Sequence, residues 1–190
     1  VLKILEFAEK NNIKVAILTN GTTIDKYLSV LEKYKDILLV QVTIDGNQEI
    51  HDKRRIRADG SGTFEEICNN VDLLIKTGIK IDYRINVDKT NMYELKDLEQ
   101  FVKGKGWDKF PNFVPYASPV LDVFGKNKKD TLTEHELYDL LIAEGLYGKN
   151  ECFIKKIVSP CIGYVENFFK NDTEMKQDTE MKQWRTNYCE

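Results

Sequence analysis

The sequence has 190 residues, of which 42% are hydrophobic and 31% are charged, with a formal net charge of −3. This length suits one domain or one domain with part of another, and the apolar share excludes a wholly disordered chain. The near-balanced charge gives no basis for a general nucleic-acid or membrane-surface binder. Because the chain shows no membrane-spanning apolar run, no secretory segment at its start and only four cysteines, we expect a cytoplasmic protein without a disulfide scaffold.

The first third of the chain alternates helix and strand patterns. Apolar residues at helical spacing predict a helix over residues 1–11. Since this helix already begins at Val1, we expect the sequence to be a fragment of a longer protein. Further patterns predict a strand over 13–19, a helix over 24–34 and a strand over 37–44.

Residues 47–62 are polar and are expected to form a loop. Thr63 and Glu66 match a capping box that begins a helix ending at Gly78. A strand is predicted over 79–87, then a helix that is capped by Asn91 with Glu94 and ends near Gly104. A short strand is predicted over 112–116.

Strands that alternate with helices indicate right-handed βαβ units, so the expected fold class is α/β with a parallel sheet. After Pro119 the pattern changes to a charged connection, a helix capped by Thr133 and Glu136, and then no dependable period. Residues 172–177 and 178–183 repeat one hexapeptide, which we interpret as a local duplication in a polar surface segment. We therefore expect two parts, residues 1–120 and a mostly helical or irregular extension over 121–190.

Polar side chains share one face of two predicted strands. Alternation places Gln41, Thr43 and Asp45 on one face of the second strand, and Asp82, Arg84 and Asn86 on one face of the third. A parallel sheet covered on both sides is apolar on both faces. These rows therefore predict a wide, partly open barrel with a polar interior for a ligand, or alternatively a solvent-facing sheet surface.

The carboxyl ends of successive strands also carry polar or turn residues, and ligands of α/β proteins bind at that edge. They are Thr19, Asn20 and Gly21, then Thr43 to Gly46, then Asn86, then Pro115 and Tyr116. Four of the five arginines lie at 54, 55, 57 and 84. The first three could form a solvated charge run. Arg84 lies within a strand, so it requires Asp82, Asp45 or an anionic ligand group as its partner.

Other reactive residues give weaker patterns. His51 and Asp52 could form an acid–base pair, although such neighbours more often form a cap or a surface turn. Cys68 lies on the apolar side of its helix and is expected to be a core thiol. The spacing of Cys152, Cys161 and Cys189 does not make a zinc site, so no metal ligand is predicted in this chain.

Four motifs carry a family resemblance: Thr19-Asn20-Gly21, Thr43-Ile44-Asp45-Gly46, His51-Asp52 followed by Arg55, and Arg84-Ile85-Asn86. In order and spacing, residues 1–120 resemble radical SAM enzymes of the SPASM/twitch type, the relatives of anaerobic sulfatase-maturating enzymes and peptide maturases. The resemblance implies part of a (β/α)₆ TIM-like barrel. It also implies that the Cys-x-x-x-Cys-x-x-Cys loop of the family, which this chain lacks, lies upstream and holds a four-iron four-sulfur cluster.

The resemblance further implies the cofactor-binding residues for S-adenosylmethionine. Thr19 and Asn20 would line its site, and Thr43 and Asp45 would face its methionine or ribose part. Arg55 would meet its carboxylate. Arg84 and Asn86 would form a polar pair, and Tyr116 would lie near adenine or substrate. No catalytic residue is assigned.

The implied function is that of a maturase that cleaves S-adenosylmethionine and abstracts hydrogen from a peptide or protein substrate. It would take electrons from a flavodoxin or ferredoxin, and the chain alone would be inactive. Cys189 resembles the first cysteine of an auxiliary-cluster (SPASM) module, toward which residues 121–190 would lead. Two alternatives stay open: a non-catalytic barrel that binds a peptide or partner, and a cluster-independent barrel lyase or aldolase that uses His51 or Asp45.

Overall fold

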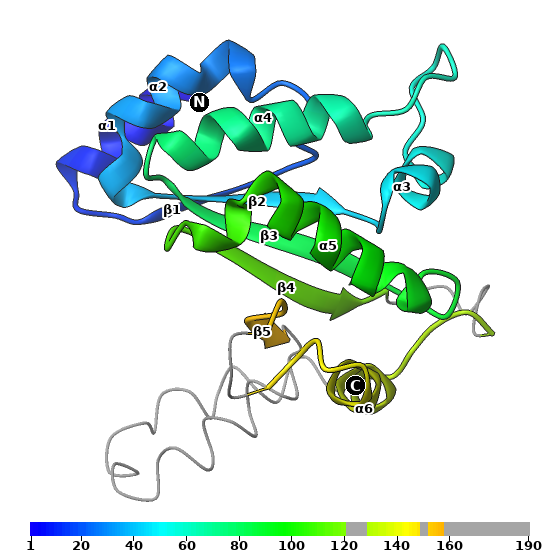
Figure 1. Cartoon of the computed structure of the whole chain (residues 1–190). Coiled ribbons are helices and arrows are strands. Elements are labelled where there is room, and N and C mark those ends of the chain that lie inside the picture. The colour runs from blue at the N-terminus through cyan, green and yellow to red at the C-terminus, as the bar shows by residue number, and fades with distance from the viewer. Residues whose placement is uncertain (121–128, 149–151, 158–190) are drawn as a thin grey trace, which may run out of the picture. The chain divides into compact units, whose positions relative to one another are not determined.

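A computed structural model describes residues 1–120, 129–148 and 152–157 of the chain. These residues belong to one compact unit, Val1–Ile157 (Figure 1). The repeated hexapeptides, Cys161 and Cys189 lie outside the described residues.

The described residues form a five-stranded parallel sheet in the order β1-β2-β3-β4-β5. The strands are β1 (Val15–Thr19), β2 (Leu38–Ile44), β3 (Lys80–Val87), β4 (Phe113–Pro119) and β5 (Lys156–Ile157). The helices are α1 (Leu2–Lys10), α2 (Leu28–Lys33), α3 (Gln48–Arg54), α4 (Phe64–Lys76), α5 (Leu95–Lys105) and α6 (Glu134–Ala143). Single 3₁₀ turns occupy Asp25–Tyr27, Lys35–Ile37, Met92–Glu94 and Trp107–Lys109. The predicted α/β class and parallel sheet are confirmed.

One face of the sheet is covered by helices α4 and α5 (Figure 1). We call it the covered face; from β2 and β3 it comprises Val40, Val42, Ile44, Ile81, Tyr83, Ile85 and Val87, and none of these side chains is exposed. Ile67, Val71 and Leu74 of α4 and Leu98 and Val102 of α5 are likewise fully buried. Cys68 lies in this core as predicted, and burial raises the pKa of its thiol to about 12.

The expectation of a loop over residues 47–62 was wrong for its first half, which forms α3. The side chain of Asn47 caps this helix, since its Oδ1 accepts the N–H of Ile50 at 3.1 Å. A seven-residue helix with one aliphatic residue shows too little apolar periodicity to be predicted.

The predicted capping box at Thr63 was also wrong, although α4 does begin there. Thr63 makes no side-chain cap. Instead, Oδ1 of Asp52 accepts the N–H groups of Thr63 and Phe64 at 2.8 and 2.9 Å. A carboxylate from the preceding helix thus satisfies the free N–H groups at the start of α4.

At Asn91, too, a tertiary contact replaces the predicted cap. The amide of Asn91 donates to the carbonyls of Asp45 and Asn86 at 2.9 and 2.8 Å. Helix α5 ends at Lys105, close to the predicted end near Gly104, and Gly106 is its C-cap. The capping box of Thr133 and Glu136, in contrast, is present at α6.

Strand β5 was not predicted, because two residues are too few for a sequence pattern. It pairs with β4 at Tyr116 and Ala117. The sheet therefore extends beyond residue 120. The boundary at this residue between the two expected parts stays a prediction.

Candidate functional site

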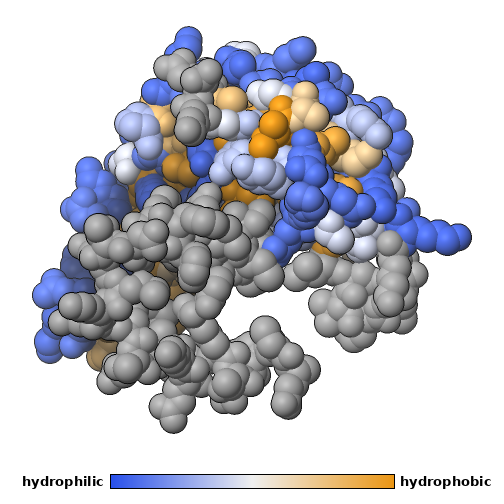
Figure 2. Space-filling model, turned by 90° about the horizontal axis from the view of Figure 1, so that it is seen from below, coloured by the Kyte–Doolittle hydropathy of each residue, from blue (hydrophilic) through white to orange (hydrophobic). Residues whose placement is uncertain are grey.

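The predicted polar rows lie on one face of the sheet. Thr43 is in register with Arg84, and Arg84 with Tyr116, so these three form one row across three strands. We call this the polar face; it comprises Gln41, Thr43, Asp82, Arg84, Asn86, Tyr116 and Ser118. Figure 2 views the molecule from the side opposite α4, where hydrophilic and hydrophobic described residues lie next to each other.

Asp45 is the centre of a hydrogen-bonded group at the end of β2. Its carboxylate accepts from Arg55 Nε at 2.7 Å and Nη2 at 3.2 Å, and from Asn86 Nδ2 at 2.8 Å. Asp45 is only 7% exposed. Three predicted site residues are therefore brought together, and the guanidinium of Arg55 has a protein partner that the sequence analysis did not anticipate.

Arg84 lacks the carboxylate partner that was considered for it. Its Nη2 donates to Ser118 Oγ at 3.1 Å, and its buried Nε has no hydrogen-bond partner among the described residues. Asp45 is bound to Arg55, and Asp82 is bound to Lys156 at 2.8 Å. Lys156 contacts only Oδ2 of Asp82, and Oδ1 of Asp82 has, like Nε of Arg84, no hydrogen-bond partner among the described residues.

Tyr116 was predicted near the end of its strand, but β4 continues to Pro119, so Tyr116 lies in the middle of the strand, in the row of Arg84 on the polar face. Its hydroxyl donates to Gln41 Oε1 at 2.7 Å, and Lys156 Nζ lies 5.0 Å from its ring centre. Burial raises the pKa of Tyr116, while Arg84 opposes that shift and Asp82 adds to it. Sequence reasoning missed Lys156, whose segment shows no periodic pattern, and Ser118, which follows the predicted end of its strand.

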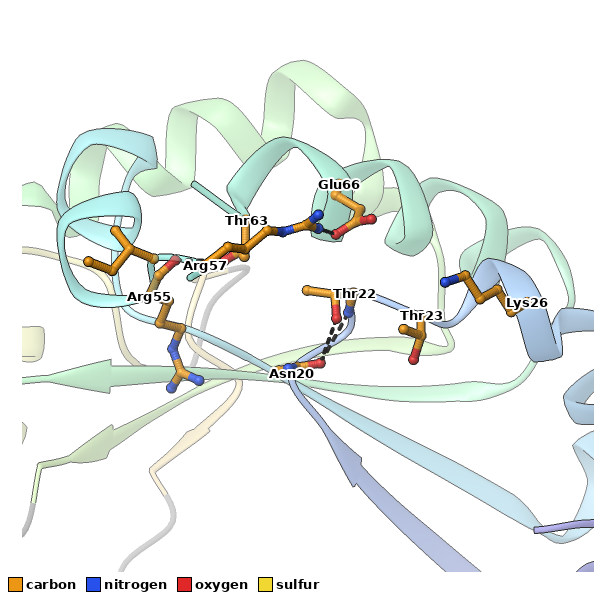
Figure 3. Close-up of a pocket in the computed structure, with 9 residues that line it drawn as sticks. Asn20, Thr22, Thr23, Lys26, Arg55, Arg57, Thr63 and Glu66 are labelled. Atoms are coloured by element: carbon orange, nitrogen blue, oxygen red, sulfur yellow. Dashed lines mark hydrogen bonds and ion pairs between the residues drawn. The ribbon is translucent and has the colours of Figure 1, made fainter. Parts of the chain in front are cut away.

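A pocket of about 380 Å³ adjoins this group, between the loop after β1 and the start of α4 (Figure 3). Two predicted residues, Asn20 and Arg55, line it. The remaining lining residues were not predicted: Thr22, Thr23, Lys26, Ile56, Arg57, Thr63 and Glu66. The arginine cluster was the available signal for Arg57, which pairs with Glu66 across the pocket wall.

Thr19 lies apart from the polar face. It is in register with Val42 of the covered face, and its Oγ1 accepts the N–H of Gly21 at 3.1 Å. Asn20 is exposed, and its Oδ1 accepts from both the backbone and the hydroxyl of Thr22. Of these two predicted residues, Asn20 lines the pocket, whereas Thr19 lies on the covered side of the sheet.

His51 is completely buried, and both of its ring nitrogens are bonded. Nδ1 accepts the N–H of Asp45 at 3.2 Å, and Nε2 lies 3.0 Å from the hydroxyl of Thr63. Burial lowers the pKa of His51 to about 4, with Asp45 opposing and Arg55 adding to the shift. A neutral ring with no free nitrogen does not suit the acid–base role that the lyase alternative gives it.

The described residues do not supply ligands for an iron–sulfur cluster. Within the three described ranges, no group of three His, Cys, Asp or Glu side chains could hold a metal ion. Cys68 is buried, and Cys152 is the other free thiol of this part of the chain. In the same residues, no helix has the length and apolar character needed to cross a membrane.

Comparisons with known proteins agree with these features. The antilisterial bacteriocin subtilosin biosynthesis protein AlbA of Bacillus subtilis is 37% identical over 106 residues, which are 55% of this chain and 23% of AlbA. A cysteine-type anaerobic sulfatase-maturating enzyme of Clostridium novyi is 30% identical over 144 residues, which are 73% of this chain and 38% of that protein. The chain therefore spans about a quarter to two fifths of the length of these relatives.

Among solved structures, native anSMEcpe with bound AdoMet and Cp18Cys peptide matches with a TM-score of 0.60 at 20% identity. The match covers 89% of this chain and 43% of that one. At this identity the likeness shows a shared fold, and it confirms the predicted partial barrel.

The family model described as the Radical SAM superfamily matches residues 1–102. This match covers more than half of the 190 residues and includes the end of β2, the Asp45 group and the polar residues of β3. S-adenosylmethionine and a four-iron four-sulfur cluster, the predicted cofactors, are those of this family. The sequence motifs, the parallel sheet and the family match agree, and the chain belongs to the radical SAM superfamily.

Proposed function

We propose that this chain forms the S-adenosylmethionine-facing part of a maturase that abstracts hydrogen from a peptide or protein substrate. In this proposal residues 1–120 belong to the core barrel and residues 121–190 lead toward an auxiliary-cluster module. The observation that carries it is Arg84, whose buried Nε has no partner within the described residues and lies on a face rich in polar side chains.

The polar face offers groups that match those of S-adenosylmethionine. The cofactor has a carboxylate and a ribose diol, which prefer guanidinium, amide and hydroxyl partners. Arg84, Asn86 and Thr43 present these groups from β2 and β3. Asp45 holds Asn86 in place through a bond of 2.8 Å, so this amide is oriented before any ligand binds.

Asn20 and Arg55 extend the proposed site into the adjoining pocket. Arg55 is held by Asp45 in a two-bond fork, and Asn20 also lines the pocket. Lys26 adds a positive charge to the lining, which favours a carboxylate-bearing ligand. Tyr116 would contact substrate or adenine from β4.

The cofactor and its cluster supply the radical chemistry when bound, and the protein supplies binding and orientation. The cluster ligands lie outside the residues described here. In this proposal Thr43, Arg84 and Asn86 hold S-adenosylmethionine against the sheet. The closely packed covered face keeps these strands fixed.

A peptide or protein substrate is supported by two relatives. AlbA is a bacteriocin biosynthesis protein, and anSMEcpe was solved with a bound peptide. An electron donor such as flavodoxin or ferredoxin is part of the proposal, because reductive cleavage of the cofactor consumes an electron.

The test uses the complete gene product, purified without oxygen and supplied with iron and sulfide. We expect reductive cleavage of S-adenosylmethionine to 5′-deoxyadenosine. Arg84→Gln should lower the affinity for S-adenosylmethionine about tenfold, since a charged hydrogen bond is lost. Lys103→Gln is the control, because Lys103 pairs with Glu99 on the surface of α5.

If the complete gene product binds S-adenosylmethionine but does not cleave it, the non-catalytic binding alternative replaces the proposal. If it binds none, the proposed site is wrong.

A further inference from the structure

His51 lies on α3 beside the Asp45 group and has no exposed surface, although its side chain is polar. A buried polar side chain is costly unless all its hydrogen-bonding groups are satisfied, and those of His51 are. Its contacts therefore indicate what it does.

The two ring nitrogens have defined roles. The N–H of Asp45 can only donate, so Nδ1 must accept and the proton of the neutral ring lies on Nε2. Nε2 then donates to the hydroxyl of Thr63, which is left to donate its own proton to the carbonyl of Arg55 at 3.1 Å. Every proton in this series has one partner.

The series closes into a ring around the Asp45–Arg55 ion pair. One path runs through the backbone of Asp45, the imidazole of His51, the hydroxyl of Thr63 and the backbone of Arg55. The other is the direct contact of the two side chains at 2.7 Å. Asp45 and Arg55 are therefore connected twice: their side chains by the ion pair, and their backbones by the hydrogen bonds through His51 and Thr63.

The neighbours of the ring hold it in place. Arg55 N–H donates to the carbonyl of His51 at 2.8 Å. Asp52, the next residue, accepts the N–H of Thr63. The ring thus joins the end of β2, α3 and the start of α4, and two of its members, Arg55 and Thr63, line the pocket.

We propose that His51 is a positioning residue for the cofactor site: its imidazole, acting through Thr63, fixes the direction of the Asp45–Arg55 pair. The inference rests on the proposed function for what the pair binds, but the geometry of the pair can be measured without any ligand. His51 touches no ligand in this proposal and transfers no proton.

The main test is Thr63→Val in the complete gene product, because valine nearly matches threonine in shape and lacks only the hydroxyl. Two quantities are measured: the affinity for S-adenosylmethionine, and the solvent exchange rate of the Arg55 Nε–H by NMR. We expect an affinity loss of about tenfold and faster exchange by a similar factor, since the carbonyl of Arg55 and Nε2 of His51 each lose a buried partner.

Two further variants separate positioning from general stability. Thr77→Val removes a hydroxyl that donates to the carbonyl of Leu74 at the other end of α4, so it should change neither quantity. Thr63→Ser keeps the hydroxyl and should restore both. Equal impairment in Thr63→Ser would assign the effect to the lost methyl group and overturn the inference.

His51→Asn supplies the second measurement. Its carboxamide can still accept from Asp45 at the place of Nδ1 but is too short to reach Thr63, so it should behave like Thr63→Val. If Thr63→Val binds S-adenosylmethionine normally and the exchange of Arg55 is unchanged, His51 is not a positioning residue. If the unmodified protein binds no S-adenosylmethionine, the proposed function fails, and the exchange of Arg55 still decides this inference.

Discussion

The two faces of one sheet are built from alternate residues of the same strands, yet they differ in kind. On the covered face, Ile81, Tyr83 and Ile85 of β3 have no exposed surface and pack under helices. On the polar face, Asp82, Arg84 and Asn86 of the same strand form directed bonds to charged and polar partners. The sheet thus separates the part that supplies the apolar core from the part on which we propose that the cofactor binds.

This contrast explains where polar atoms are left unpaired. On the polar face, Nε of Arg84 and Oδ1 of Asp82 have no partner within the described residues. On the covered face, the hydroxyl of the fully buried Tyr83 has no partner within the described residues. Arg84 belongs to the proposed site, whereas the unpaired hydroxyl of Tyr83 is a cost of filling the core with a large aromatic ring.

The largest effect is expected from a cavity in the covered face. Ile81→Ala removes fully buried methyl and methylene groups, so the free energy of unfolding should fall by about 2–5 kcal/mol. Urea denaturation followed by circular dichroism measures it. Thr43→Ala on the polar face should change stability by less than about 1 kcal/mol. Equal losses in the two variants would contradict the division between the faces.

The next effect is a pH dependence from His51. The unfolded chain takes up this proton below about pH 6.5, but the folded protein does so only near its pKa of about 4. The stabilising contribution is therefore fully present above pH 6.5 and is lost as the pH falls toward 4, with a slope of at most about 1.4 kcal/mol per pH unit.

Unfolding is measured between pH 6.5 and pH 4.5, in the unmodified protein and in His51→Asn. Asp88 and Glu136, whose carboxyl pKa values are lowered by their partners, add to the loss of stability mainly at the acid end of this range and below it. His51→Asn should flatten the slope, and an unchanged slope in that variant would rule out His51 as its source.

A smaller effect is expected at the start of α4, the helix that packs on the covered face and lines the pocket with its first turn. A Cβ atom on Gly62 would overlap the carboxylate of Asp52. Asp52 would move and release the two N–H groups that it accepts, so Gly62→Ala should cost about 1–2 kcal/mol. Thermal unfolding measures the change.

Gly104→Ala is the matched control for that variant. Gly104 lies within α5, and an added Cβ there meets no atom within 4 Å. This substitution should stabilise the protein by about 0.5–1 kcal/mol. A destabilised Gly104→Ala protein, or an unaffected Gly62→Ala protein, would refute the steric explanation.

The smallest and most selective effect compares two tyrosines on opposite faces. Tyr116→Phe removes a hydrogen bond of 2.7 Å to Gln41 and should cost about 1 kcal/mol. Tyr83→Phe removes a hydroxyl that has no partner in the described part, so it should be neutral or stabilising. Unfolding in urea distinguishes the two, and a reversed order would show that the faces do not differ in this way.

The sequence predicted the strands, the main helices and the division of polar and apolar residues well, because alternation in β2 and β3 is a local property. It predicted Asp45, Arg55 and Asn86 but not their mutual contacts. Their direct bonds join residues that are 10 and 41 positions apart, and no local pattern contains such information.

The mistaken capping boxes have the same origin. Thr63 and Asn91 have the right residue type for a cap, but each makes tertiary hydrogen bonds that a local motif does not contain. Thr133 lies in a more exposed segment and keeps its local cap. A local signal is reliable where nothing distant competes for the same side chain.

The order of the strands in the sheet has a consequence for biosynthesis. Each strand pairs with the one synthesised just before it, so a growing chain always meets a finished edge on which to add the next strand. Assembly can keep pace with translation from one βα unit to the next, without waiting for a distant segment to emerge from the ribosome.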